Sequence, residues 1–402
     1  MKRLPRALLV AMLTLGAAAG AGAATLSGRG STQALWFADE FGQDHLDVAQ
    51  YLRFSARGLD ARDSVRVSGY GRAWGDATQG GGIDARLYNL SLDKKEIAKR
   101  TDVRIGRQFF FVGAGSGIVD GARVDTRALG PVAMTLIGGR DVVFDTTGEA
   151  TRRGNVAAAV QVGLTNIPGG SLDLSYLVKY DENDLAREIY GLTANKRFGK
   201  AAEVYTQIRL DALSEVFSEI QAGARTNIVP RLTVNAEYFR SIPVFDASSI
   251  FVVFAVERFQ EILLRADYDL TPLVSLSGEY RNEDYGGGDT ANAGEAGFRY
   301  RPQDGTSVYG AAIWRVGTGG NLYGFELSGD RVFAKKYTLG AGVQHDSFRR
   351  ELMNDYDVAT RFYAGGEAWV LKNLSVAARI EDTVSDRIGK DLRARLALNY
   401  DF

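Results

Sequence analysis

Two histidines and one serine are the residues of this chain that most directly suggest chemistry. His45 and His345 are its only histidines, and cysteine is absent. His345 and Ser347 stand two residues apart, so in a β-strand they would share one face, where an imidazole can activate a hydroxyl for nucleophilic hydrolysis. With so few ligands and no thiolate, a clustered metal site or covalently attached haem is disfavoured. We therefore expect no metal and no cofactor in this chain.

The alternation of apolar and polar residues along the chain predicts that these groups lie on β-strands. Between Val204 and Asp211 the two kinds alternate with the period of two of a β-strand. Similar segments of about 10–12 residues follow one another along the chain, longer than the ~5–6 residues of a soluble strand and typical of a tilted membrane-crossing strand. The apolar residues that we expect to face lipid include Ile208, Ala222, Val234, Leu264, Leu276 and Leu396.

The polar face of these segments carries charges of both signs. The chain has 48 Lys and Arg against 49 Asp and Glu, so no net charge points to nucleic acid. If the strands close into a barrel, this face lines a water-filled lumen, and rings of charge would set its selectivity. The expected lumen-facing residues are Glu203, Arg209, Glu219, Arg225, Glu237, Glu261, Arg265, Asp267, Glu279, Arg281, Glu295, Arg299, Arg379, Glu381, Arg393 and Arg395.

Short connections between the segments give the strand count. Five of them contain proline, which is tolerated where no backbone donor is needed. These are Pro131, Pro168, Pro230, Pro272 and Pro302, and we expect all five to lie at one end of the barrel. About ten short turns alternate with longer connections rich in Gly, Asp, Asn and Ser, the asymmetry of periplasmic turns and extracellular loops. We predict about 22 antiparallel strands, with 18 or 20 acceptable because "ARLYNLSL" and "AIWRVGTGG" do not keep parity.

The first residues have the pattern of a secretory signal. A basic start is followed by an apolar run from Ala7 to about Ala19 and by the small residues Ala21-Gly22-Ala23. The run is too short to cross about 30 Å of hydrocarbon as a helix. We expect residues 1–23 to be a cleaved signal peptide and residues 24–402 to form one domain.

The last segment, "DLRARLALNYDF", puts Leu398, Tyr400 and Phe402 on one face. It resembles the terminal strand of bacterial outer-membrane β-barrel proteins, which the barrel-assembly machinery reads. The resemblance implies an all-β, closed transmembrane barrel in the outer membrane, crossing it many times and contacting lipid and lipopolysaccharide. It also implies that the last strand closes against the first, near "TLSGRGSTQALWF". Closure is required because an unpaired backbone group in hydrocarbon costs several kcal/mol.

Such a barrel has a wide lumen, and the sequence offers no separate plug domain. The apolar run Ile250 to Val256, within the connection from Ser241 to Glu257, is the best candidate for an inward-folded constriction. It would serve equally well to extend two strands above the membrane or to cap the rim. The first hypothesis for the protein is therefore a channel for passive diffusion of small hydrophilic solutes or ions.

Two further resemblances give alternative functions. A wide barrel without a plug resembles the porin-like part of outer-membrane porin-cytochrome complexes, in which a multihaem cytochrome would fill the lumen. The pair His345 and Ser347 resembles outer-membrane phospholipase A, in which an Asn orients the imidazole. The Asn-Gly of that family is absent after the Ser, and Asn354 lies in a loop, so a histidine that ends a strand is the preferred interpretation and we expect no enzyme.

Two other stretches have simple interpretations. The glycine-rich "VGAGSG", Val112 to Gly117, precedes no helix, so a phosphate-binding loop is disfavoured and a flexible loop is expected. The acidic run Asp181 to Asp184 lacks the spacing of a calcium loop. We expect it to be a solvated loop tip.

Overall fold

A computed structural model describes most of the chain. It covers residues 24–39, 41–80, 82–97, 99–144, 154–164, 166–227, 229–245, 257–349, 355–386 and 389–402. The predictions for residues 1–23, for the run Ile250 to Val256 and for Asn354 lie outside these ranges. Within them, no helix is long and apolar enough to cross a membrane.

The described residues form a single sheet of 22 strands. The strands are β1 (Thr25–Ala38), β2 (Asp44–Arg57), β3 (Val65–Asp76), β4 (Asp84–Ile97), β5 (Thr101–Val112), β6 (Gly115–Leu129), β7 (Val132–Asp141), β8 (Val156–Leu164), β9 (Gly170–Asp181), β10 (Asp184–Phe198), β11 (Ala202–Asp211), β12 (Val216–Thr226), β13 (Leu232–Ser241), β14 (Phe259–Asp269), β15 (Val274–Asp284), β16 (Thr290–Tyr300), β17 (Thr306–Gly317), β18 (Asn321–Phe333), β19 (Tyr337–Arg349), β20 (Asp357–Leu371), β21 (Leu374–Ser385) and β22 (Gly389–Asp401).

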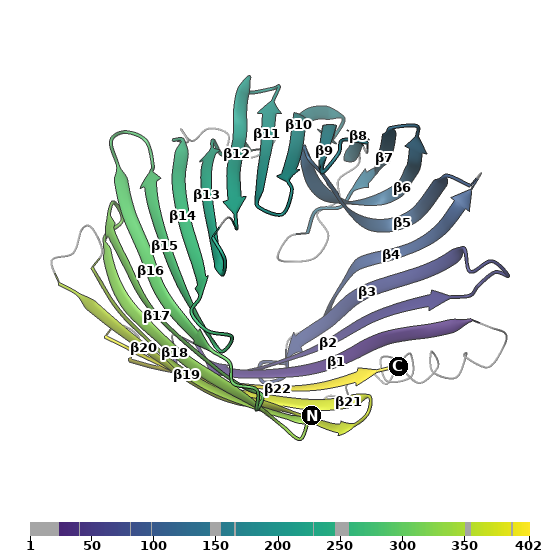
Figure 1. Ribbon diagram of the computed structural model, residues 1–402. Helices are drawn as coiled ribbons and strands as arrows, with labels where there is room; N and C mark the ends of the chain where they lie inside the picture. The colour runs from purple at the N-terminus through teal and green to yellow at the C-terminus, as the bar shows by residue number, and fades with distance from the viewer. Residues whose placement is uncertain are drawn as a thin grey trace.

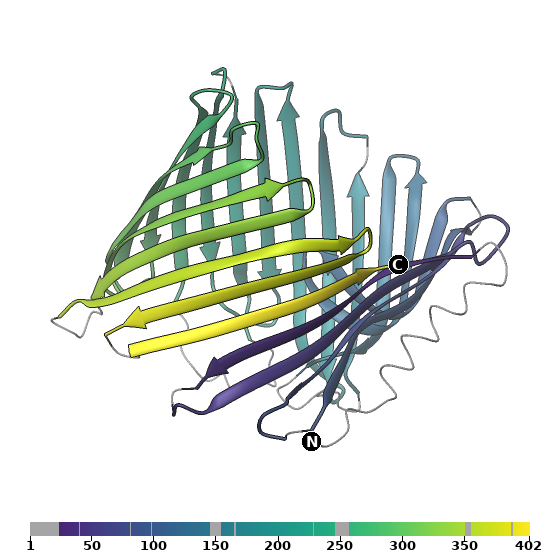
Figure 2. The same ribbon diagram turned by 90° about the horizontal axis from the view of Figure 1, so that it is seen from below.

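Each strand pairs antiparallel with the next one in the chain, from β1 and β2 to β21 and β22, and β22 returns to pair with β1. Figure 1 shows the resulting ring of strands, and Figure 2 shows the yellow β22 lying beside the purple β1. The predicted closed antiparallel barrel of about 22 strands is therefore confirmed. Closure leaves the sheet without a free lateral edge between its first and last strands.

The closure between β1 and β22 extends to the last residue. Nine residue pairs join the strands, from Arg29 opposite Asp401 to Phe37 opposite Arg393. Beyond them, the amide of Phe402 donates to the carbonyl of Gly28 over 3.0 Å, and the amide of Gly28 donates to the carbonyl of Phe402 over 2.7 Å. Arg29 also donates to both carboxylate oxygens of Asp401, at 2.5 and 2.9 Å. The predicted pairing of the terminal strand with the first strand is confirmed.

The two ends of the barrel differ in their connections. Ten connections lie at the end of the barrel where β1 begins and β22 finishes. They are every second connection along the chain, from the one between β2 and β3 to the one between β20 and β21. All five prolines named above fall in this set, after β6, β8, β12, β14 and β16. The prediction that they share one end of the barrel is thus confirmed. The longest connections, 142–155 and 242–258, are at the opposite end, which by the same asymmetry is the extracellular one.

The prediction of longer connections at the extracellular end is wrong at two places. β5 and β6 are joined by Gly113 and Ala114 alone, and β9 and β10 by Glu182 and Asn183 alone. Glu182 and Asn183 have φ values of 53° and 78°, the left-handed pair whose twist matches that of adjoining antiparallel strands. The acidic run is therefore not a loop: Asp181 ends β9, Asp184 begins β10, and Glu182 and Asn183 form a tight turn between them.

The outer face of the wall is apolar. Leu264, Leu276 and Leu396 are 48, 41 and 53% exposed, and each lies opposite another apolar side chain on a neighbouring strand. A soluble protein rarely exposes so much continuous apolar surface. Lipid acyl chains provide the environment in which such a surface is stable.

Candidate functional site

The charged residues predicted for the lumen share one face of the sheet. Residues directly opposite each other in an antiparallel pair point to the same side. Glu203 faces Arg225 and Arg209 faces Glu219 across β11 and β12, and the same side continues through Arg265 opposite Glu279 to Arg379 opposite Arg395. Following the register around the ring places all sixteen residues on this face.

Several of these charges form ion pairs. Arg209 lies 2.8 Å from Glu219, and Arg265 lies 3.0 Å from Asp267 and 3.8 Å from Glu279. Further pairs join Arg281 with Glu279, Arg379 with Glu381, Arg393 with Asp391, and Glu203 with Arg197. Because opposite charges alternate around the wall, their fields largely cancel and favour neither cations nor anions strongly.

Other members of the set meet polar or aromatic groups. The hydroxyl of Tyr205 donates to Glu237 over 2.5 Å, and that of Tyr309 donates to Glu295 over 2.7 Å. Arg395 donates to Gln33 over 2.6 Å. The guanidinium of Arg299 lies 5.5 Å from the ring centroid of Tyr309, and that of Arg379 lies 4.0 Å from that of Tyr363. The side chains of Arg225 and Glu261 form no hydrogen bond or ion pair with another described residue.

A hairpin formed by the extracellular ends of β5 and β6 leaves the wall. Pairing between β4 and β5 ends at Leu90 and Arg107, and pairing between β6 and β7 begins at Val119 and Asp141. From Gln108 to Gly117 the strands have paired partners only in each other, and at Ile118 the carbonyl already accepts from the amide of Val142 over 2.9 Å. We call this segment, residues 108–118, the inserted hairpin. In Figure 1 it curves across toward β9 and β10.

The inserted hairpin is anchored on the inner face of β8 to β11. The amide of Gly113 donates to Gln161 over 3.3 Å, and Arg209 donates to the carbonyl of Gly113 over 2.9 Å. A Cβ on Gly113 would lie 2.8 Å from the Ser175 hydroxyl and 3.0 Å from that of Thr193. Only glycine lets the turn approach the wall so closely. These contacts also identify the charged face of the sheet as its inner one.

The hairpin buries an apolar cluster inside the barrel. Phe110, Val112 and Ala114 are at most 1% exposed, and they pack with side chains of the wall that are themselves buried. The wall residues of the cluster are Val119, Ile137, Ala157, Ala159, Leu177 and Ile189. The prediction that Val112 to Gly117 is a flexible loop is therefore wrong. This stretch is a tight, packed turn that occupies part of the lumen.

The edge of β4 is partly covered where β5 turns away from it. Arg107 donates to the carbonyl of Leu87 over 3.1 Å, which satisfies one acceptor on the exposed edge of β4. Phe144, from the connection between β7 and β8, packs edge-on against Tyr88 at a centroid distance of 5.6 Å and under Arg86 at 4.6 Å. Covering a free strand edge in this way protects its backbone groups.

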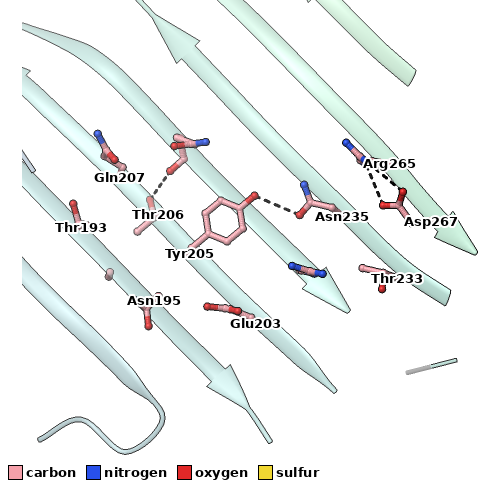
Figure 3. A pocket seen from close by; sticks show the side chains of 13 residues that line it. Thr193, Asn195, Glu203, Tyr205, Thr206, Gln207, Thr233, Asn235, Arg265 and Asp267 are labelled. Carbon is pink, nitrogen blue, oxygen red and sulfur yellow. Dashed lines mark hydrogen bonds and ion pairs between the residues drawn. The ribbon is translucent and has the colours of Figure 1, made fainter. Parts of the chain in front are cut away.

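A polar pocket lies on the inner wall directly below the inserted hairpin, toward the end of the barrel that holds the prolines. Its volume is about 630 Å³. Figure 3 shows side chains of β10 to β14 around the ring of Tyr205, with Arg265 and Asp267 joined at one side. Gln207 lines the pocket, and Arg209, two residues further along β11, holds the hairpin. Sequence alternation had placed the charges here but gave Tyr205 no special role.

The connection from Ser241 to Glu257 starts out over the inner face. The carbonyl of Val244 accepts a hydrogen bond from Arg187 on β10, three strands away from β13. The amide of Ile242 donates to Ser218 over 2.9 Å. The apolar run within this connection lies outside the described residues.

The histidines have local partners. His345 and Ser347 lie on the outer face, as the parity of β19 predicts, but Nδ1 of His345 pairs with the hydroxyl of Thr360 at 2.9 Å. The described residues show no hydrogen bond between His345 and Ser347, so they hold no assembled nucleophile and base. His45 is paired with Asp76 at 2.7 Å and Asp39 at 3.3 Å near the extracellular rim. Within the described ranges no three His, Asp or Glu side chains form a metal-type cluster.

These features define the class of protein. A closed antiparallel barrel with an apolar outer face and a polar, charged inner face is the architecture of the outer membrane. The chain is therefore a multi-pass outer-membrane β-barrel protein whose outer face contacts lipid.

Comparisons with known proteins concern the fold. No protein-family model matches the chain, and no curated protein matches it by sequence. Among solved structures, the translocation pore of the P pilus usher PapC is similar with a TM-score of 0.54 at 10% identity, covering 94% of this chain and 99% of that one. OccK3 (OpdO) of Pseudomonas aeruginosa gives 0.48 at 14% identity, covering 94% and 95%, and OccAB3 of Acinetobacter baumannii gives 0.47 at 10%, covering 94% and 99%. The likeness to the usher pore, at so low an identity, supports the barrel fold alone.

Proposed function

We propose that the protein is a porin-like channel for passive diffusion of small hydrophilic solutes or ions across the outer membrane. The observation that carries this proposal is the inserted hairpin. A wide barrel needs something to narrow it, and here residues 108–118 are packed against the inner wall. A packed hairpin narrows the lumen without filling it and leaves a water-filled path lined by balanced charges.

The remaining parts of the proposal concern the chain ends and the wall. Residues 1–23 are a signal peptide removed before assembly. The sixteen charged residues named above line the aqueous path and keep it hydrated. Leu398, Tyr400 and Phe402 form the strand that the assembly machinery reads, and the 45 and 47% exposure of Leu398 and Tyr400 leaves their outer-face side chains accessible.

The experiment is conductance of the purified protein in planar bilayers. The matched variant replaces Phe110 to Gly117 by Asn-Gly, a two-residue turn suited to joining Phe109 directly to Ile118. Because these strands pair only with each other there, the wall keeps its register and conductance should rise. Shortening the extracellular turn at 318–320 is the control and should leave conductance unchanged. An impermeable wild-type barrel, or a hairpin deletion without effect, would refute the proposal.

The second candidate is a sheath around a multihaem cytochrome. The inserted hairpin weighs against it, because the hairpin already occupies space that the partner would need. A haem-bearing protein that copurifies with the barrel in a non-conducting complex would establish the sheath and displace the channel.

A further inference from the structure

Tyr205 lies flat on the inner wall in the middle of the polar pocket. A Cβ on Gly223, the residue directly opposite on β12, would lie 2.3 and 2.8 Å from two carbons of the Tyr205 ring and 2.4 Å from its hydroxyl oxygen. The ring therefore covers the backbone of Gly223, and no larger residue fits beneath it. Its hydroxyl is held by Glu237 at 2.5 Å and by Asn235 at 3.4 Å, so the orientation of the ring is fixed.

The rest of this ring lines the polar pocket and is partly exposed. Figure 3 shows the ring face-on, with its hydroxyl directed at Asn235. Among the described residues no cation and no second ring stacks on it. Tyr363 provides the contrast, because it lies over Gly342 in the same way while the guanidinium of Arg379 sits 4.0 Å from its centroid. Tyr205 is thus an aromatic platform on which no described side chain stacks.

The groups around the platform favour a neutral ligand. Glu203, Arg225, Arg265 and Asp267 contribute two charges of each sign to the pocket, so it has no net charge with which to select an ion. Most of its remaining lining consists of Thr, Asn and Gln side chains, which both donate and accept hydrogen bonds.

Part of this hydrogen-bonding capacity is unused. The side chains of Gln221, Arg225 and Thr233 form no hydrogen bond with another described residue, although all three line the pocket. Planar amide and guanidinium groups beside an exposed ring match a molecule that carries hydroxyls on its rim and C–H groups on one face. Sugars have this distribution of polar and apolar atoms.

We propose that the Tyr205 pocket is a binding subsite for neutral sugars, in which one pyranose ring stacks on Tyr205 while Gln221, Arg225 and Thr233 bind its hydroxyls. The inference rests on the proposed channel function and names its solute class. Because the pocket lies directly below the inserted hairpin, a sugar that has passed the constriction meets this surface next. Weak binding there raises the local solute concentration without trapping it.

The test uses the neutral trisaccharide raffinose and the detergent-solubilised full-length barrel. Saturation transfer from protein to sugar in NMR spectra detects weak binding and does not depend on conductance. The wild-type barrel should give transfer, and Tyr205→Ala should weaken binding roughly 3- to 10-fold, since one aromatic stacking contact contributes about that factor. Tyr363→Ala, which removes a lumen tyrosine already covered by Arg379, is the matched control and should bind raffinose as the wild type does.

Two further measurements keep the proposal separate from the channel function. If Tyr205→Ala does not fold, Gln221→Leu removes a hydroxyl-binding amide, keeps a side chain of similar size, and should weaken binding too. Glucuronate, a negatively charged sugar, should bind no better than raffinose. Absence of transfer to raffinose, equal binding by Tyr205→Ala and the wild type, or clear preference for glucuronate would overturn the subsite. A barrel that binds raffinose but does not conduct would overturn the channel and leave the subsite standing.

Discussion

The inserted hairpin should be a permanent constriction, and a disulfide can test this because the chain has no cysteine of its own. A Cβ built on Gly113 lies 3.8 Å from the Cβ of Ser175, which matches the mean separation of about 3.8 Å in disulfides. The double variant Gly113→Cys and Ser175→Cys should therefore form a cross-link between the turn and β9. The Thr193 hydroxyl, 3.0 Å from the new Cβ, has to rotate aside.

The expected effect of this cross-link follows from the apolar contacts of the hairpin. Lifting it would expose Phe110 and Val112 on the hairpin and Leu177 and Ile189 on the wall, all at most 7% exposed now. Full burial of such a side chain is worth about 1.5–3 kcal/mol, and half of that for four side chains gives roughly 3–6 kcal/mol. Every 1.4 kcal/mol or so changes an equilibrium constant tenfold, so the hairpin should be lifted in only about one molecule in a hundred to one in ten thousand.

Single-channel recording is the assay. Because the wild-type hairpin is docked almost all the time, the cross-linked variant should show the same main conductance before and after reduction. Thiol labelling should find no free cysteine before reduction and two afterwards, and each single-cysteine variant serves as its control. A conductance that rises on reduction, or two well-populated open levels, would show that the hairpin moves as a gate and that its burial energy is much smaller.

Three other predictions concern the wall and its turns. Leu264→Arg should cost about 2–4 kcal/mol of unfolding free energy in lipid vesicles, whereas Arg at the inward-facing neighbour Leu263 should be tolerated; equal losses would contradict the assigned faces. Asp401→Asn should lower stability by only about 0.2–1 kcal/mol in denaturant titrations, because its ion pair at the closure seam is largely exposed. The Lys94 ammonium and Ser64 hydroxyl hold the pKa of Asp60, in the turn after β2, well below its usual range. Since a depressed carboxylate pKa stabilises the fold above the unfolded value, amide protection in this turn should fall as the pH drops below about 3.9, and should not change in Asp60→Asn.

The regular part of the barrel was predictable because its two faces meet different environments. From β11 to β16, outward residues such as Leu264 contact lipid and inward residues such as Arg265 contact water. The polarity of a residue there predicts which face of the sheet it occupies. Prolines in the turns then fixed which ends of the strands belong together. These signals are local, and they suffice for the strand count and the closure.

The irregular part was not predictable from alternation. In β4 the register shifts between Leu87 and Asn89, opposite Tyr70 and Gly71, which explains why "ARLYNLSL" keeps no parity. In the inserted hairpin the inward residues Phe110 and Val112 contact protein instead of water, so the expected polar face is missing. The apolar run "FFFV" directly before glycines was the one available signal, and a two-residue turn could have been inferred from it.

Because β1 pairs with β22, the strands form a closed ring, and the chain ends could be placed at another turn without changing the order of strands around the barrel. Phe402 pairs with Gly28, so the beginning of the first strand and the end of the last are neighbours at the same rim. A short linker there, with new ends opened at the tight turn of Glu182 and Asn183, would yield a circularly permuted chain that retains nearly every pairing. In the natural order the seam joins residues 372 positions apart, and in the permuted order it becomes an ordinary hairpin. Which two strands form the long-range seam therefore depends on where the polypeptide is cut, while the strand pairings of the wall stay nearly the same.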